Sequence, residues 1–174
     1  MSRWYFEFSP AHAYLPPRSA KTGGATHMVI RREPFLAVGG FPEDWRMAVD
    51  VFALARFAVA GGSIRFEPEI VGRHVNVPGM RWMVRHVYHF GRWTAKVRRA
   101  YPHLSGGTAI KWPILSLGLW LARLGLLYVR VLTAQRGPRL SLLYHTPGIL
   151  VALIAWNAGF TREAFRSSDK STTY

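Results

Sequence analysis

The chain of 174 residues contains no cysteine, so disulfide bonds and thiolate chemistry are excluded. Acidic residues are also scarce: 9 Asp+Glu stand against 23 Lys+Arg, and the formal net charge is +14. The sequence has no Asp or Glu between Glu69 and Glu163, although arginines and lysines recur throughout that interval. A stretch of this kind is suited to the phosphate groups of an anionic membrane surface.

Basic composition alone is compatible with either nucleic acid or a membrane as the partner. The chain is also 49% hydrophobic. Residues 141–160 carry no charged side chain over about 20 positions, the length of a helix that spans a bilayer. This run favours a membrane partner and argues against a nucleic-acid-binding protein. The dipeptide Pro147-Gly148 interrupts it, so a kinked span, a re-entrant hairpin and a buried core helix all remain open.

Segment 109–133 is apolar as well, but Lys111, Arg123 and Arg130 interrupt it. Arg123 and Arg130 are seven positions apart and therefore share one face of a helix. This pattern is typical of an amphipathic helix in the membrane interface rather than of a clean span. The basic turn 136–139 between the two apolar segments predicts a cytoplasmic loop. Residues 1–17 do not have the pattern of a signal peptide, and we expect the chain to begin inside a larger fold.

Local patterns before residue 103 predict alternating short strands and helices. Glycine pairs at 39–40 and 61–62 are expected to end two of the helices. The expected elements are an extended piece or short helix and a loop over 1–24, a buried strand over 25–32, a helical turn over 32–41, a helix over 47–60, strands over 63–69 and 70–75, and a basic aromatic helix over 78–100.

Asp50 is an acid in the first turn of the predicted helix 47–60, which is apolar in nearly every direction and is therefore expected to be buried. The helix dipole stabilises an ionised carboxylate at this position. A carboxylate that opens to a cleft would serve as a general base. The same residue also suits a helix start without any catalytic role. The residues alone leave both interpretations open.

Asp50 also belongs to a longer pattern of residues. This pattern comprises Gly24, Arg31-Arg32, Phe35, Gly39-Gly40-Phe41, Asp50, Arg56, Gly61-Gly62, Phe66-Glu67-Pro68 and His74. In order and spacing it resembles the C-terminal half of the catalytic domain of family-2 glycosyltransferases, over residues 20–95. That family consists of inverting, nucleotide-sugar-dependent enzymes of the GT-A fold.

The resemblance implies an α/β fold: a partial GT-A-like (Rossmann-like) catalytic half followed by an α-helical membrane-associated region. The implied parts are an acceptor-side catalytic half over 1–103, membrane-associated or transmembrane helices over 104–165 and a polar tail over 166–174. The family's donor-binding half carries an Asp-x-Asp motif for Mg²⁺ or Mn²⁺, and no such motif occurs in the 174 residues. We therefore expect the donor half, with the main metal ligands, in a preceding segment or in a separate donor-binding chain.

The resemblance also assigns roles. Asp50 falls on the family's catalytic base, which deprotonates a hydroxyl acceptor, either a glycan or a lipid, for attack on a nucleotide-sugar. His74 falls on a histidine near the metal and the diphosphate, although a solvent-facing histidine at a strand end is an equal alternative. Arg56 is grouped with the substrate-binding residues. The implied location is the cell membrane, with the catalytic part on the cytoplasmic side.

The stretch "HFGRW" at 89–93 resembles a Gln-x-x-Arg-Trp motif of processive family members, with His89 in place of Gln. Arg92 would meet the diphosphate and Trp93 would stack on an acceptor sugar. The alternative is an interfacial helix whose Arg and Trp lie at the lipid headgroups. Two other positions depart from the family pattern, since Val49 and Phe52 stand where acids are common. A non-catalytic membrane scaffold derived from the same fold therefore remains the competing hypothesis.

Overall fold

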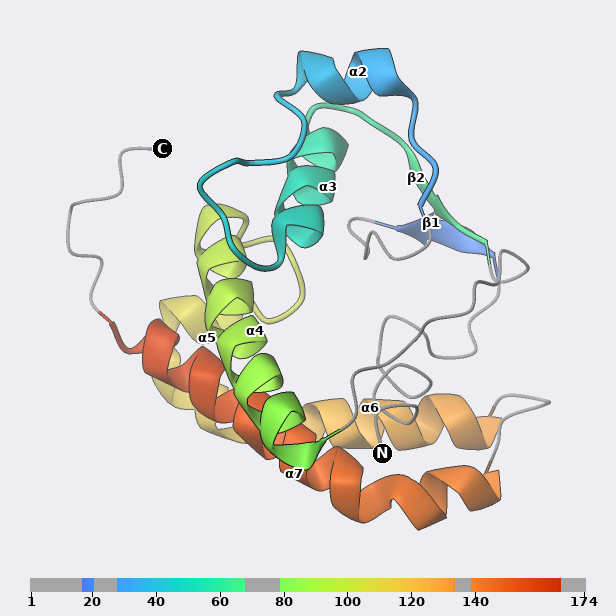
Figure 1. Ribbon diagram of the computed structural model, residues 1–174, viewed down its shortest axis with the longest axis vertical. Helices are drawn as coiled ribbons and strands as arrows, with labels where there is room; N and C mark the ends of the chain where they lie inside the picture. The colour runs from blue at the N-terminus through green and yellow to red at the C-terminus, as the bar shows by residue number, and fades with distance from the viewer. Residues whose placement is uncertain (1–16, 21–27, 68–78, 134–138, 167–174) are drawn as a thin grey trace.

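The computed structural model describes residues 17–20, 28–67, 79–133 and 139–166. Most of these residues are helical. Figure 1 shows α2, α3 and a small sheet at one end of the molecule, α6 and α7 at the other, and α4 between them. In chain order the elements are β1 (Arg18–Ala20), α2 (Arg32–Ala37), α3 (Val49–Val59), β2 (Ile64–Phe66), α4 (Met80–Ala100), α5 (Thr108–Lys111), the 3₁₀ helix η2 (Pro113–Gly118), α6 (Leu119–Thr133) and α7 (Arg139–Ala164).

The sheet differs from the α/β expectation. β1 and β2 pair antiparallel, with Ser19 opposite Arg65, and they form the whole sheet within the described residues. A Rossmann-like half would show parallel strands, so the described part does not confirm a partial GT-A fold. The expected strand 25–32 is wrong where the structure describes it, because 28–31 pair with no described strand and α2 already begins at Arg32. The strand expected over 70–75 lies outside the described residues.

The helices match their predicted positions more closely. α2 ends where Gly39 and Gly40 adopt positive φ angles of 89° and 56°, and Gly61 follows α3 with φ 89°. Such left-handed conformations favour glycine. α4 ends at Ala100, two residues before Pro102, as expected from a proline that cannot continue a helix.

The two apolar segments near the C-terminus form a helical pair. α7 runs without a break through Pro147, so a re-entrant turn at that proline is wrong. The segments Pro113–Thr133 and Arg139–Ala164 are both long and apolar enough to cross a membrane by length and composition. Large apolar side chains remain exposed along both of them, so α7 is not the buried helix of a soluble core.

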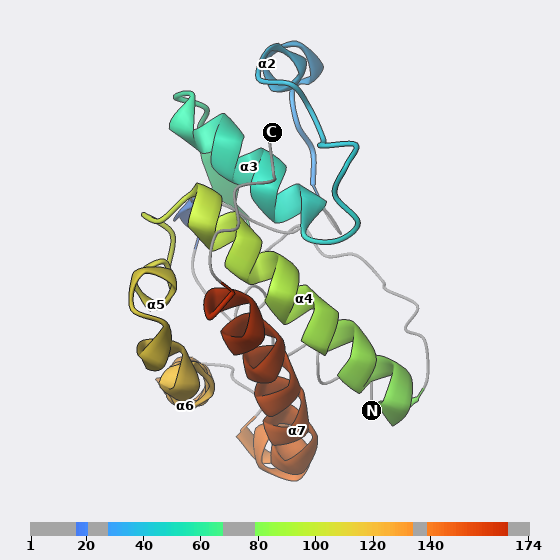
Figure 2. The same ribbon diagram turned by 90° about the vertical axis from the view of Figure 1, so that its left-hand side faces the viewer.

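Two apolar clusters share α4. The larger cluster joins α4, through Met83, Val87 and Ala95, to α6 and α7. The smaller cluster joins the C-terminal end of α4, through Val97, to the start of α3. α4 therefore fixes the position of α3 relative to the α6–α7 pair, and this linkage is visible from two directions in Figures 1 and 2.

The closest approach between α4 and α7 is at two glycines. A Cβ atom added to Gly91 would lie 2.0 Å from the carbonyl oxygen of Trp156, and one added to Gly159 would lie 1.9 Å from the carbonyl oxygen of Tyr88. Ala95 and Ala155 lie one turn away on the same helices. Small residues four apart allow helix backbones to approach closely, as they do in membrane proteins.

This crossing generates a stability prediction. Gly159→Ala places a methyl group against a backbone carbonyl, so the helices must separate, and we expect a loss of about 2 kcal/mol. That loss exceeds the roughly 1 kcal/mol that alanine gains over glycine in a helix. Thermal unfolding followed by circular dichroism in detergent micelles measures the change.

The matched control is Gly125→Ala in α6, where an added Cβ meets nothing within 4 Å. This variant should unfold at an unchanged or slightly higher temperature, because only helix propensity changes. Equal melting temperatures for the two variants would contradict the packing of α4 on α7 described above.

Candidate functional site

Asp50 occupies the first turn of α3, where the sequence predicted it. Its side chain is half-buried, and its Oδ1 atom accepts a hydrogen bond of 2.8 Å from the backbone N–H of Val51. The residue before the helix, Ala48, has φ 56° and is the described non-glycine residue with a left-handed conformation. An alanine there costs about 1 kcal/mol, and strained backbone of this kind gathers at functional sites. Asp50 thus lies in the first helical turn, two residues after a strained backbone position.

Arg56, six residues after Asp50, holds the glycine turn against α3. Its Nη2 atom donates a 2.6 Å hydrogen bond to the carbonyl oxygen of Gly40, and its guanidinium lies 5.6 Å from the ring centre of Phe52. A Cβ on Gly39 would lie 3.2 Å from the Arg56 guanidinium. The spacing of the glycine pair and the arginine therefore has a structural cause. The observed partner of Arg56 is the protein backbone, and its predicted role in substrate binding remains untested.

Trp93 lies in an aromatic cluster that docks α4 onto the start of α3. Its ring centre is 5.1 Å from that of Trp45, which in turn is 4.3 Å from Phe52. The Lys96 ammonium sits 4.1 Å above the Trp93 ring. Val49 and Val51, on either side of Asp50 in the chain, pack against the same cluster. The structure thus brings Trp93 and the Asp50 turn into one neighbourhood.

Tyr101 closes this cluster at the end of α4. Its ring centre lies 5.3 Å from that of Phe52. Burial raises the pKa of the Tyr101 phenol, and the positive charge of Arg56 acts in the opposite direction. The tyrosine is therefore neutral at physiological pH, and the cluster beside Asp50 contains no second negative charge from it.

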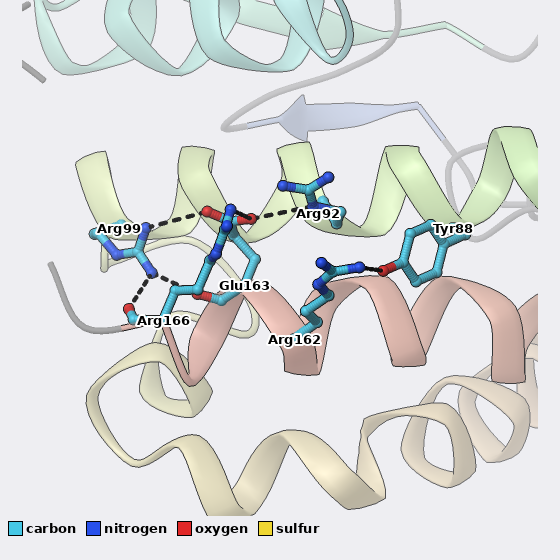
Figure 3. A network of polar contacts seen from close by, with 6 residues as sticks. All are labelled: Tyr88, Arg92, Arg99, Arg162, Glu163 and Arg166. Carbon is cyan, nitrogen blue, oxygen red and sulfur yellow. Dashed lines mark hydrogen bonds and ion pairs between the residues drawn. The ribbon is translucent and has the colours of Figure 1, made fainter. Parts of the chain in front are cut away.

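Arg92 points away from Trp93 and toward α7. Its Nε atom is 3.2 Å from Oε2 of the buried Glu163. Arg99 donates to the backbone carbonyl of Glu163 at 2.7 Å, and Arg166 approaches the same carboxylate at 3.9 Å. Figure 3 shows the network that these residues form between the two helices. The predicted contact of Arg92 with a diphosphate would therefore have to use the guanidinium N–H groups that do not bond to Glu163.

Glu163 is the residue that the sequence-based analysis missed. It is the acid that ends the interval without carboxylates after Glu69. The sequence pattern that could have identified it is a single Glu at the end of an apolar helix, after a long interval that contains many arginines and no acid. A buried carboxylate must be paired or neutralised, which indicates basic partners for Glu163 without identifying them.

The histidines do not form a metal site in the described residues. His74, the predicted metal neighbour, lies outside them, and no described group of three His, Asp or Glu side chains is placed to hold a metal ion. His86 stacks on Trp82 with ring centres 4.6 Å apart. Burial, followed by the nearby His89, lowers the pKa of His86, which keeps its imidazole neutral at pH 7.

Comparison with curated proteins supports a relation to glycosyltransferases. The chain is 30% identical over 129 residues, 70% of its length, to the pre-mycofactocin glycosyltransferase of two strains of Mycobacterium tuberculosis. The match covers 27% of each relative, so the chain spans little more than a quarter of their length. No protein-family model and no solved structure matches the chain.

The Glu163 network generates a second stability prediction. Glu163→Gln leaves Arg92 and Arg99 facing a neutral side chain across the interface of α4 and α7. We expect a loss of about 2 kcal/mol, below the range for fully buried pairs because both arginines reach solvent. Chemical unfolding in detergent micelles measures it.

The control is Glu67→Gln, which removes the partner of Arg65 at 3.1 Å, an arginine whose side chain is 73% exposed. Exposed pairs contribute less than about 1 kcal/mol, so this variant should unfold almost as the parent does. A Glu163 variant that unfolds no more easily than the Glu67 variant would show that the network contributes nothing to holding α7.

Proposed function

We propose that this chain supplies the acceptor side of a membrane-associated, inverting glycosyltransferase, with Asp50 as the general base. The observation that carries the proposal is the placement of Asp50 at a strained helix start, in a chain similar to glycosyltransferases. The assignment to family 2 and to the GT-A fold rests on the sequence motifs. The proposed substrates are a nucleotide-sugar and a hydroxyl acceptor, either a glycan or a lipid.

In the proposed reaction, the acceptor hydroxyl approaches the start of α3. Its oxygen forms a bond to the anomeric carbon of the donor sugar while the bond to the nucleoside diphosphate breaks on the opposite face, and Asp50 takes the hydroxyl proton. The clamp of Arg56 on Gly40 keeps this turn in place, since the hydrogen bond joins the glycine turn to α3. Arg56 is thus a positioning residue in this mechanism.

Two further roles belong to this proposal. A sugar that stacks on Trp93 takes the place of the Lys96 ammonium, which already lies over that ring.

The described residues do not fit a divalent metal, so Mg²⁺ or Mn²⁺ would be held by the donor-binding part, and no step of the proposed mechanism depends on it here. The catalytic side is proposed to face the cytoplasm, where nucleotide-sugars are made available.

A non-catalytic scaffold is the second candidate. The observation that favours it is that Arg56 and Arg92 both bond to the protein itself, to Gly40 and Glu163 respectively. Two residues assigned to substrate binding thus have structural partners. A scaffold of this kind would bind a partner enzyme without requiring Asp50.

The decisive variant is Asp50→Asn, which preserves the shape of the side chain but removes its basicity. In the complete membrane-bound system we expect sugar transfer to fall by about 10²–10⁴-fold, the usual contribution of a general base. Binding of the nucleotide-sugar should remain nearly intact, since Asp50 acts on the acceptor. The measurement is release of UDP or GDP from UDP-glucose and GDP-mannose by native membranes.

Asp44→Asn is the matched control, because Asp44 is an exposed acid in the loop before the same helix. It should transfer sugar at the parental rate. Full turnover by the Asp50 variant would rule out the general-base assignment and favour the scaffold.

A further inference from the structure

The exposed apolar side chains of α7 lie along one side of that helix. They recur at spacings of three, four and seven, so they form one stripe from Leu140 to Ile154. Its members are Leu140, Leu143, Tyr144, Val151 and Ile154, each at least 43% exposed. α6 and η2 carry a similar set, which includes Ile114, Leu121, Leu126, Val129 and Leu132.

α4 packs on the other side of α7. The α7 residues that meet it are Trp156, Gly159 and Glu163, which are spaced three and four apart and lie roughly opposite the exposed stripe on the helix. α4 itself is rich in arginine. The exposed stripe and α4 are therefore on opposite sides of α7, and Figure 2 shows α4 and α6 flanking α7.

The length of α7 that is free of α4 is too short to cross a bilayer. α4 contacts α7 at least from Trp156 onward, so at most 139–155 is free, which is no more than about 25 Å at 1.5 Å per residue. The hydrocarbon core of a bilayer is about 30 Å thick. If α7 crossed it, the part of α4 that precedes Gly91, which includes Arg85, would enter the membrane with it.

The charges on α6 lead to the same conclusion. The Arg123 guanidinium lies 3.8 Å from the ring centre of Trp156, in the middle of the helix pair, and Arg130 follows two turns later. In a crossing hairpin Arg123 would lie deep in hydrocarbon, where an arginine costs several kcal/mol. In a hairpin lying flat, both side chains reach the headgroups.

The extent of the exposed stripe also distinguishes the two arrangements. Exposed apolar residues continue to the end where α4 and α5 pack, with Leu117 on η2 and Phe165 just beyond α7. A crossing hairpin would confine its apolar surface to the part clear of those helices. Apolar surface at both ends of the pair fits a pair that contacts lipid at both ends rather than at one.

We infer that the α6–α7 pair lies flat in one leaflet of an anionic bilayer and does not cross it, with α4 above it on the water side. The partner is thus a single phospholipid leaflet, recognised by an apolar face and by the exposed Lys111 and Arg139, which precede η2 and begin α7. This inference does not require that the protein transfers sugar. The connection between α6 and α7 is then on the same side of the membrane as Asp50.

The absence of cysteine allows a direct test, because any introduced thiol is unique. Thr133→Cys marks the end of α6 next to that connection, and Ser105→Cys marks the turn after α4. Both positions are exposed. The full chain is labelled with a membrane-impermeant maleimide in spheroplasts and, separately, in inverted membrane vesicles. We expect both variants to react in the same preparation and neither in the other.

Val151→Cys, on the exposed stripe, reports lipid contact. It should react about tenfold or more slowly than Ser105→Cys in intact membranes, since hydrocarbon excludes a charged reagent, and should reach the same rate after detergent is added. Melting curves establish that each variant is folded. Reaction of Thr133→Cys and Ser105→Cys from opposite sides would overturn the inference in favour of a crossing hairpin. Equal rates for Val151→Cys and Ser105→Cys without detergent would overturn it by excluding the membrane.

Discussion

The contact of α4 with α7 at Gly91 and Gly159 is the constraint on which the rest of the structure depends. At this point each backbone occupies the space that a side chain of the other helix would need. Such an approach brings the Glu163 carboxylate within reach of arginines on α4. The ion pair between Arg92 and Glu163 can form only because the two helices are close together. The arginine in turn supplies the positive charge that the buried carboxylate needs. The stretch "HFGRW" is therefore first of all a helix-crossing motif in this protein.

α4 transmits the geometry of that crossing to the candidate site. One face of the helix packs on α7, while Trp93 and Val97 face the start of α3. The aromatic cluster packs against the first turn of α3, which carries Asp50. If α6 and α7 lie flat in a leaflet, the position of Asp50 above the membrane is fixed by α4 alone. An acceptor held at the lipid surface, whether lipid-linked or glycan, would then reach α3 along the exposed side of α4.

Some of this organisation could be predicted from the sequence. The glycine pairs, the basic helix and the position of Asp50 follow from local rules, because turn conformations and helix ends depend on neighbouring residues. The role of Glu163 and the true partner of Arg92 could not be predicted in this way, since residues 92 and 163 meet only through the packing of two helices. The expected strand over 25–32 is absent from its described part, 28–31, for a related reason. Apolar residues make a strand only where another strand receives their backbone hydrogen bonds.

The roles that the sequence resemblance implies differ most from the observed contacts at the two arginines, Arg56 and Arg92. A pattern of Arg56 after Asp50, or of Arg92 before Trp93, identifies the residue but not its partner. In the described structure Arg56 bonds to a glycine turn and Arg92 to a buried acid. Both bonds hold in place the elements that surround Asp50, so loss of either arginine would impair a transferase even without a direct contact to substrate. Asp50 differs from them in its chemistry, because a carboxylate can accept a proton from a hydroxyl group whereas a guanidinium stays protonated. That difference is why the catalytic hypothesis rests on the aspartate rather than on the arginines around it.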